Sequence, residues 1–562
     1  MVRIRTPAGR HDRRRSEGYW RDVVIDAHVA AAARDAPDAV AVVDGAARIT
    51  YRDLENSIEA VAASLAGLGV SRGEPVSWQL PNWHEALILH HAVLRLGAVS
   101  NPIIPIYRQR EVGYILRQTR SRVVVVPGTF RGFDYPAMLS ELRPGLPHLR
   151  HVVVARSSES PVPSPDAQGS GVLGFEELLR GDPGSVPAVA RDADDPMLLM
   201  FTSGTTADPK GVIHTHNTLD YECRSIIQVY GLRPDDVVFM PSPVTHITGL
   251  LYGLQLPAML GTRVVLQDIW DATTALRLIE AERCSFTVAA TPFLHGLVHH
   301  PQLASYDVSS LRVFACGGAD VPPGLIRQAD SRLGTTATRV YGSTEFPTLS
   351  TSPPDAPEDK RAGTDGQPIG AAEYRIVADD GATLPVGQIG ELMVRGPELF
   401  PGYLADADND GAFTADGWFR TGDLASADAD GYVSIQGRKK DIILRGGENI
   451  SATEVENLLF EHPAVREVAI VAMPDPVLTE RACAFIVPAP GASPTLADLT
   501  EYLVGKQLAR QKLPERVEIV DELPKTQSGK VQKFRLREFI RDKLAPAATR
   551  DPLTAPGVDD SL

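Results

Sequence analysis

Runs of β-branched apolar residues alternate along this chain with segments of helical spacing. Residues 123–126 form one such run, and residues 51–68 carry apolar side chains every three or four positions, as one face of a helix requires. The alternation resumes further along, with strand-like runs at residues 237–240 and 338–341. Strands and helices that alternate in this way build parallel sheets, so we expect an α/β fold whose helices cover both faces of a parallel sheet.

The pattern changes near residue 374 to short strands joined by Asp-Gly turns. A basic stretch at residues 437–440 indicates a hinge, and the segments beyond it predict a small α+β domain. At 562 residues the chain is too long for a single core. We therefore expect a basic tail (residues 1–24), a large domain of parallel-sheet α/β layers with a β subdomain (residues 25–436), a small mobile α+β domain (residues 437–544) and a disordered tail (residues 545–562).

Composition narrows the possible classes of protein. The hydrophobic content of 43% and charged content of 23% are ordinary for a globular protein, and the net charge of -15 argues against nonspecific nucleic-acid binding. No apolar run approaches the roughly 20 residues that a membrane span needs. The scattered cysteines (Cys223, Cys284, Cys316 and Cys483) are typical of reduced thiols, so we expect a cytoplasmic protein.

The first residues are rich in arginine between Arg3 and Arg15. No apolar segment follows them, so they do not have the pattern of a secretory signal. We expect this stretch to be a solvated tail.

A small, hydroxyl-rich loop follows the apolar run at residues 197–201. It begins at Thr202 and ends at Lys210-Gly211. Backbone N–H groups in such a loop can approach phosphate oxygens closely, and Lys210 can add a positive charge. An ordinary surface turn remains the alternative interpretation.

The spacing of this loop differs from that of the P-loop of ATPases. Pro209 stands where the P-loop has its second glycine, and Gly211 stands where the P-loop has the hydroxyl that binds Mg²⁺. If the loop binds a nucleotide, the metal ligand must come from another part of the chain.

Further motifs occur later in the chain, in a fixed order. They are Pro-Val-Thr-His (residues 243–246), Tyr-Gly-Ser-Thr-Glu (341–345), Gly-Trp-Phe-Arg-Thr-Gly-Asp (417–423), Gly-Arg-Lys-Lys-Asp (437–441), Gly-Gly-Glu-Asn-Ile (446–450) and Pro-Lys-Thr-Gln-Ser-Gly-Lys (524–530). Together with residues 202–211, they make the chain resemble the adenylate-forming enzymes: AMP-binding acyl-CoA synthetases, adenylation domains of peptide synthetases and luciferases. The resemblance extends from about residue 30 to residue 540.

The resemblance implies a two-step reaction. A carboxylate attacks the α-phosphate of ATP, which releases pyrophosphate and leaves an acyl-adenylate; the thiol of coenzyme A then takes the acyl group. Two anions must meet in the first step, so catalysis depends on positioning and on charge neutralisation. The implied cofactors are ATP, Mg²⁺ and coenzyme A.

The resemblance also implies roles for individual residues. The loop residues Thr202, Ser203, Gly204, Thr205, Thr206 and Lys210 would hold the β- and γ-phosphates; Ala207 departs from the family's usual glycine. Glu345 would bind Mg²⁺, and Thr344 would contact the phosphate or the acyl carboxylate. The adenine would lie against Gly317, Gly318, Ala319, Tyr341 and Gly342, and the ribose would contact Asp423 and Arg438. Without the motifs, Glu345, Asp423 and Arg438 would each pass for an ordinary surface or turn residue.

Residues of the small domain are expected to divide between the two steps. By resemblance, Lys530 bridges the acyl carboxylate and the phosphate during adenylation. The domain then turns about Lys440, which removes Lys530 and brings Gly446 and Gly447 to the tunnel for the thiol.

The acyl pocket is expected to involve His246, Val244, Thr248 and Phe346; a capping or core role is the alternative for His246. No acidic residue near residues 242–246 is available to bind an ammonium group. This absence favours a plain carboxylic acid, and the run at residues 242–252 resembles synthetases for short, medium or alicyclic acids.

Other functions remain open at this point. The acceptor could be the thiol of an acyl carrier protein in place of coenzyme A. A luciferase-like oxygenase and a non-catalytic nucleotide-binding regulator are further alternatives; the joint presence of Glu345, Asp423, Arg438 and Lys530 speaks against the regulator. A homodimer is possible.

Overall fold

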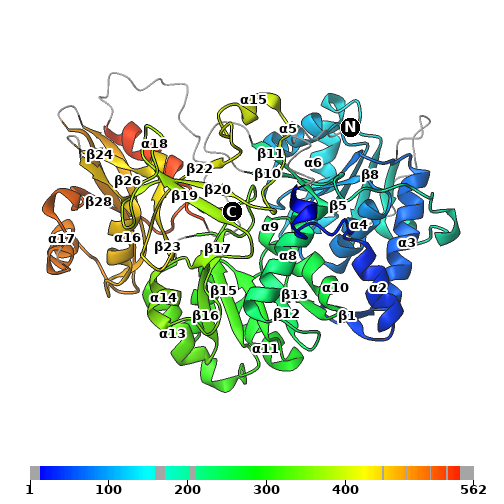
Figure 1. The fold of residues 1–562 in the computed structure, drawn as a ribbon, viewed down its shortest axis with the longest axis horizontal. Helices are drawn as coiled ribbons and strands as arrows, with labels where there is room; N and C mark the ends of the chain where they lie inside the picture. The colour runs from blue at the N-terminus through cyan, green and yellow to red at the C-terminus, as the bar shows by residue number, and fades with distance from the viewer. Residues whose placement is uncertain are drawn as a thin grey trace. The chain divides into compact units, whose positions relative to one another are not determined.

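The computed structural model describes residues 13–157, 171–202, 209–319, 321–445, 448–475, 478–506, 508–526 and 530–544. These residues form two compact units (Figure 1). The larger unit runs to Thr421 and also includes Ala425–Ile435. The smaller unit contains Gly422–Leu424, Gln436–Thr526 and the residues from Lys530 onward.

The first sheet of the larger unit has eight strands. Their order across the sheet is β21 (Gly402–Tyr403), β11 (Lys210–Thr215), β10 (Pro196–Thr202), β4 (Val99–Pro102), β3 (Pro75–Trp78), β5 (Val123–Pro127), β8 (His151–Ala155) and β9 (Gly171–Gly174). The strands from β10 to β9 pair in parallel, whereas β11 and β21 add antiparallel strands at one edge. Every residue of β5 is buried, as expected for a β-branched strand covered on both faces.

The second sheet has nine strands. Their order is β18 (Gln367–Pro368), β17 (Ser350–Thr351), β16 (Thr336–Tyr341), β15 (Val313–Gly317), β14 (Phe286–Ala289), β12 (Val237–Met240), β13 (Arg263–Leu266), β1 (Val40–Asp44) and β2 (Ala47–Thr50). Its central strands are parallel. The expected α/β architecture is therefore confirmed, but it is built on two large sheets.

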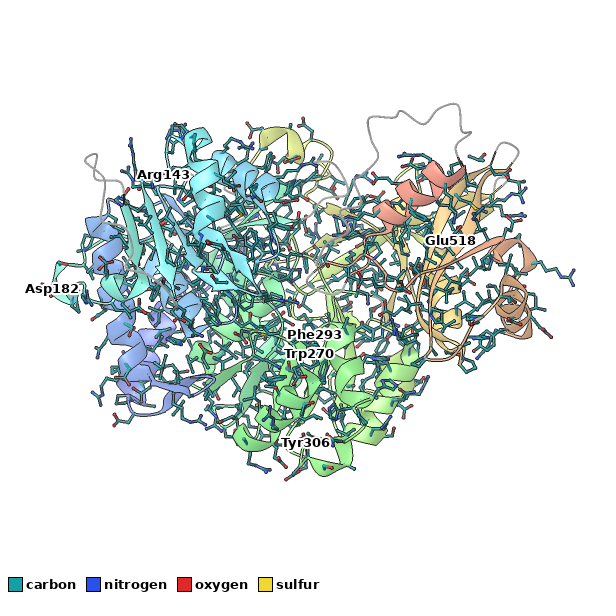
Figure 2. All side chains as sticks on the ribbon, turned by 180° about the vertical axis from the view of Figure 1, so that it is seen from behind. Arg143, Asp182, Trp270, Phe293, Tyr306 and Glu518 are labelled. Carbon is teal, nitrogen blue, oxygen red and sulfur yellow. The ribbon has the colours of Figure 1, made fainter. Side chains whose placement is uncertain are left out.

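Helices cover and separate these sheets. The helix α4 (His84–Arg95) contacts β4 of the first sheet and β1 of the second, and its residues from Glu85 to Leu94 are all buried. The remaining helices of the larger unit are α2 (Ala27–Asp35), α3 (Tyr51–Gly67), α5 (Gln109–Thr119), α6 (Tyr135–Leu142), α7 (Phe175–Leu178), α8 (His216–Tyr230), α9 (Ile247–Gly249), α10 (Leu256–Leu260), α11 (Ala272–Glu282), α12 (Thr291–Val298), α13 (Pro323–Leu333), α14 (Glu358–Gly363) and α15 (Asp406–Asn409), together with the π-helical turn η3 (Leu250–Gln255). Behind the second sheet, Trp270 packs edge-on against Phe293 of α12, with ring centroids 4.8 Å apart (Figure 2).

Smaller strands complete the larger unit. A four-stranded sheet has the order β19 (Glu373–Val377), β20 (Gly390–Arg395), β22 (Phe419–Ala427) and β23 (Val433–Arg438). A two-stranded ribbon pairs β6 (Thr129–Phe130) with β7 (Phe133–Asp134). The four-stranded sheet is the expected β subdomain, and the expected turns contain Gly381 and Gly431, whose φ values are 85° and 83°.

The smaller unit combines a sheet with helices, as expected for an α+β domain. Its strands are β24 (Ile443–Arg445), β25 (Glu448–Ile450), β26 (Val465–Asp475), β27 (Thr479–Pro488) and β28 (Arg516–Ile519). Its helices are α16 (Ala452–Phe460), α17 (Leu496–Gly505) and α18 (Lys533–Leu544). The paired strands β26 and β27 carry buried residues on both faces: one face contributes Ile470 to one core cluster and the other contributes Val471 to a second.

Local sequence signals explain several element boundaries. The helix α3 begins after Thr50, whose side chain accepts a hydrogen bond from the N–H of Asp53, and its apolar face is buried through Leu54, Ile58 and Leu65. The strand β15 begins at Val313 and continues to Gly317, past the apolar run at residues 313–315. It reaches Gly317 because the parallel ladder with β16 continues to the pair of Gly317 and Val340.

The expected solvated tail is wrong for the part that the structure describes. Arg14 is buried; its guanidinium donates to the carbonyl of Gly396 at 2.5 Å and lies 5.0 Å from the ring centroid of the buried Trp20. Arg15 forms ion pairs with Asp22 and Asp194. These arginines are held because buried carbonyls and nearby carboxylates accept their N–H groups.

Two further expectations lie outside the described residues: residues 1–12 and the tail at residues 545–562. Within the described ranges, no helix is long and apolar enough to cross a membrane. The described cysteines Cys223, Cys284, Cys316 and Cys483 are all buried free thiols, as the sequence predicts.

Candidate active site

The hydroxyl-rich loop connects two antiparallel strands. Thr202 at the end of β10 pairs with Lys210 at the start of β11, so the loop closes a β-hairpin. Thr202 and Lys210 are both half-buried. The loop residues between them, Ser203, Gly204, Thr205, Thr206 and Ala207, lie outside the described residues.

Lys210 lies against β21 and α15. Its ammonium nitrogen is 5.0 Å from the ring centroid of Tyr403 and 3.5 Å from the carboxylate Oδ1 of Asp408. Tyr403 reaches this position because β21 pairs with β11, and the N–H of Leu404 donates to the carbonyl of Gly211 at 2.7 Å. The cation therefore has an aromatic face and a carboxylate as neighbours.

Tyr403 also connects Lys210 with Glu345. Its hydroxyl donates to Oε1 of Glu345 at 2.8 Å, and the N–H of Phe400 donates to the carbonyl of Glu345 at 2.9 Å. No sequence motif singles out Tyr403. A tyrosine after a glycine carries no chemical signal by itself, and its role becomes visible only once β21 is known to pair with β11.

Thr344 is held in place by a side chain of β11, the second strand of the hairpin. Nε2 of His214, on β11, lies 2.7 Å from the carbonyl oxygen of Thr344, and its Nδ1 lies 3.1 Å from Oγ1 of Thr218. Burial lowers the pKa of His214 to about 4, so the ring is neutral and has one donor and one acceptor. The ring donates to the carbonyl and accepts from the threonine hydroxyl. Thr344 is therefore held from β11 through His214, and Glu345 from the neighbouring strand β21 through Tyr403.

The residues expected at the adenine meet at the ends of β15 and β16. Gly317 pairs with Val340, which places Gly317, Gly318 and Ala319 beside Tyr341 and Gly342. A Cβ atom at Gly317 would lie 2.1 Å from the carbonyl oxygen of Val340, and one at Gly342 would lie 1.9 Å from that of Pro347. Only glycine allows these close approaches.

Asp423 and Arg438 lie together on β22 and β23. Nε of Arg438 is 3.1 Å from Oδ1 of Asp423; the aspartate side chain is buried and that of the arginine is 37% exposed. The two residues expected at the ribose therefore form one ion pair.

The residues expected at the acyl pocket do not share one environment. Val244 and Phe346 are buried in core clusters, where Phe346 is grouped with Leu349 and Phe400. His246 and Thr248 are half-buried at the start of α9. Phe346 and Val244 are thus packed within the cores of the fold, and only His246 and Thr248 keep exposed surface.

The remaining predicted residues belong to the smaller unit. Lys530 is exposed; its N–H donates to Oγ1 of Thr526 at 3.1 Å, beside the bridge between Lys525 and Val531. Lys440 lies in the 3-10 helix Lys439–Asp441, directly after β23. Gly446 and Gly447 lie outside the described residues.

Glu345 is suited to hold a divalent cation. Its half-buried carboxylate accepts one hydrogen bond from Tyr403, and an ionised carboxylate has further lone pairs on both oxygens. Carboxylate oxygen is the ligand type that Mg²⁺ prefers. The cluster of Thr202, Lys210, Thr344, Glu345 and Tyr403 thus combines a cation, hydroxyl groups and a candidate metal ligand.

Comparison with known proteins agrees with this arrangement. A family model for AMP-binding enzymes matches residues 29–404, and one for the C-terminal domain of AMP-binding enzymes matches residues 454–530. The medium-chain fatty-acid–CoA ligase of Escherichia coli (strain K12) is 35% identical over 533 residues, which cover 94% of this chain and 93% of that protein. The salicylyl-CoA synthase / salicylate adenylyltransferase of a Streptomyces species is 34% identical over 548 residues, covering 95% and 96%.

A solved structure extends the comparison to the fold. The anthranilate CoA ligase AuaEII, in complex with anthranoyl-AMP, superposes with a TM-score of 0.83 at 28% identity, covering 93% of this chain and 98% of that one. Matches to the family extend along both compact units. The chain therefore belongs to the AMP-binding enzyme family, as its sequence motifs predict.

Proposed function

We propose that this protein is an acyl-CoA synthetase. It activates a carboxylic acid with ATP to an acyl-adenylate, releases pyrophosphate, and transfers the acyl group to the thiol of coenzyme A. Contacts from Lys210 through Tyr403 to Glu345 carry the proposal. They connect a cation suited to bind phosphate with a carboxylate suited to bind a metal ion. The relatives that are CoA ligases support the choice of acceptor.

Each group has a role that follows from its chemistry. Lys210 and the hydroxyl of Thr202 bind the outer phosphates of ATP, and Glu345 holds the metal ion. Mg²⁺, when bound, neutralises phosphate charge as pyrophosphate leaves. Asp423 accepts hydrogen bonds from the ribose hydroxyls, and Arg438 holds this carboxylate in position.

An acyl carrier protein is the alternative acceptor. The name of the salicylate relative includes an adenylyltransferase activity, which ends at the adenylate and does not by itself require coenzyme A. The acid is a small-molecule substrate in either case. We also propose a cytoplasmic location and a homodimer.

Carboxylate-dependent ATP–pyrophosphate exchange tests the proposed function. Purified protein with ATP, Mg²⁺ and labelled pyrophosphate is expected to exchange label only when a suitable acid is added, and a panel of aliphatic and aromatic acids identifies it. Adding coenzyme A or a phosphopantetheinylated carrier protein then reveals the acceptor through the mass of the thioester. Exchange that no acid stimulates would contradict the proposal.

Replacing Tyr403 with phenylalanine should reduce the exchange rate roughly 10- to 100-fold. The change removes the hydroxyl that donates to Glu345 and leaves the ring beside Lys210. A hydrogen bond to a charged group contributes about 1.5–3 kcal/mol, so its loss should weaken the positioning of Glu345 by an amount in this range. The exchange rate and its Mg²⁺ dependence are measured together.

The matched control is Tyr306→Phe, a half-buried tyrosine that packs against the core cluster containing Phe314 (Figure 2). The control should keep the wild-type exchange rate. Equal rates in the Tyr403 variant and the control would show that the hydroxyl of Tyr403 does not support Glu345.

Replacing Lys440 with proline should impair thioester formation more than adenylation, by roughly tenfold or more. We propose that backbone rotation at this residue separates the two half-reactions, and proline fixes φ near -65° and restricts the preceding residue. The segment directly after it is held in the smaller unit by an ion pair of 2.6 Å between Asp441 and Arg537. Single-turnover assays of each half-reaction measure the effect, and Lys440→Ala is the control. Undiminished transfer to coenzyme A in the proline variant would exclude Lys440 as the hinge.

A further inference from the structure

The first described residues of the chain lie against a loop of the larger unit that is distant in the sequence. Arg14 is 8% exposed, and its guanidinium donates to the carbonyl oxygens of Gly396 and Pro397 at 2.5 and 3.4 Å. The indole N–H of Trp20, which is 5% exposed, donates to the same carbonyl of Pro397 at 3.1 Å. Two buried side chains of the N-terminal segment therefore hold two neighbouring carbonyl groups.

The N-terminal segment is itself held in one conformation. The guanidinium of Arg14 lies 5.0 Å from the ring centroid of Trp20, and the carbonyl of Arg14 accepts the N–H groups of Tyr19 and Trp20. The guanidinium of Arg224, on α8, donates to the carbonyl of Tyr19. These contacts fix the directions in which Arg14 and Trp20 present their donors.

The loop that accepts these donors connects β20 to β21. Residues 396–400 are all buried, and a buried carbonyl group that lacks a donor is costly. Within the loop, the N–H of Leu399 donates to the carbonyl of Gly396 at 3.3 Å. A Cβ atom at Gly396 would lie 2.8 Å from Cζ of Phe346, the residue that follows Glu345. The loop therefore packs closely against the segment that carries Glu345.

The same loop also holds Glu345 by hydrogen bonds. The N–H of Phe400 donates to the carbonyl of Glu345 at 2.9 Å, and the hydroxyl of Tyr403, shortly after the loop, donates to its Oε1 at 2.8 Å. The rings of Phe400 and Tyr403 meet edge to face, with centroids 4.8 Å apart. A displacement of residues 396–400 would therefore move both of the groups that hold Glu345.

We propose that Arg14 and Trp20 are positioning residues for Glu345, which they hold in place through the loop at residues 396–400. The inference rests on the proposed function, in which Glu345 binds Mg²⁺. It gives the N-terminal segment a part in adenylation, whereas the arginine-rich sequence predicts only a solvated tail. Loss of a group that supports a metal ligand typically lowers metal affinity or activity roughly 10- to 100-fold.

Replacing Arg14 with methionine tests the inference, because methionine keeps a long apolar side chain and removes the donors to the loop. The variant should lose roughly tenfold in the rate of acid-dependent ATP–pyrophosphate exchange and need more Mg²⁺ for half-maximal rate. Arg14→Lys, which keeps a donor, should recover part of both. The matched control is Arg13→Met: this neighbouring arginine is 73% exposed and pairs with Glu17, so both quantities should stay at their wild-type values.

A second variant and a double variant separate positioning from stability. Trp20→Phe keeps an aromatic ring and removes the N–H that donates to Pro397, so it should change the Mg²⁺ requirement in the same direction by a smaller factor. Arg14→Met and Tyr403→Phe act on the same carboxylate. The double variant should therefore lose less than the product of the two single losses. Thermal unfolding shows which variants are folded at the assay temperature, and Trp20→Phe decides the question if Arg14→Met is not.

The possible failures are distinguishable. Slower exchange with an unchanged Mg²⁺ requirement in the folded variants would show that Arg14 and Trp20 only stabilise the fold, and would overturn the inference. Wild-type kinetics in these variants, or losses that multiply in the double variant, would also overturn it; all three results leave the proposed function intact. Failure of every acid to stimulate exchange by the wild-type protein would refute the proposed function itself, and the inference with it.

Discussion

Lys530→Ala should abolish adenylate formation and leave thioester formation from supplied acyl-adenylate largely intact. The first half-reaction brings a carboxylate to a phosphate, so a lysine ammonium that contacts both would stabilise charge that develops only in that step. Loss of one such group in other enzymes lowers the rate by roughly 10²–10³-fold. The second half-reaction starts from an adenylate in which this charge has already been redistributed, and it does not need the ammonium.

The exposed position of Lys530 makes its replacement a clean test. Lys530 is exposed, and it lies beside the bridge between Lys525 and Val531, so its replacement removes no buried packing. ATP–pyrophosphate exchange measures the first half-reaction, and release of AMP on addition of coenzyme A to acyl-adenylate measures the second. Lys506→Ala, which removes a surface ion pair with Glu461 in the same unit, is the control and should leave both rates unchanged. Equal loss of both half-reactions in the Lys530 variant would refute the proposed role.

The α/β architecture was predictable because its signals are local. Apolar spacing predicted α3, and β-branched runs predicted strands such as β5. The strand predicted at residues 338–341 forms the end of β16, so Gly342 to Glu345 directly follow that strand. These features depend on the periodicity of side chains within one segment, which a single sequence displays directly.

Contacts between distant segments were not predictable in this way. Tyr403 meets Glu345 only because the short strand β21 pairs with β11. Arg14 was expected in water, since no local pattern shows that carbonyl groups at residues 396–397 would accept its N–H groups.

Replacing Glu345 with glutamine should lower acid-dependent ATP–pyrophosphate exchange roughly 100-fold or more and raise the Mg²⁺ concentration needed for half-maximal rate. Glutamine keeps the size of the side chain and a carbonyl oxygen that can accept from Tyr403, so the change removes chiefly the negative charge. A metal ion held by a neutral amide binds more weakly, and several kcal/mol of charge stabilisation depend on that ion. Glu373→Gln, an exposed glutamate bonded to Arg395, is the matched control and should retain both the rate and the Mg²⁺ dependence. A slow Glu345 variant with an unchanged Mg²⁺ requirement would assign this carboxylate to positioning alone. A variant with the wild-type rate would exclude Glu345 from the site. Only a joint change in rate and Mg²⁺ dependence supports Glu345 as the metal ligand that the loop at residues 202–211 lacks.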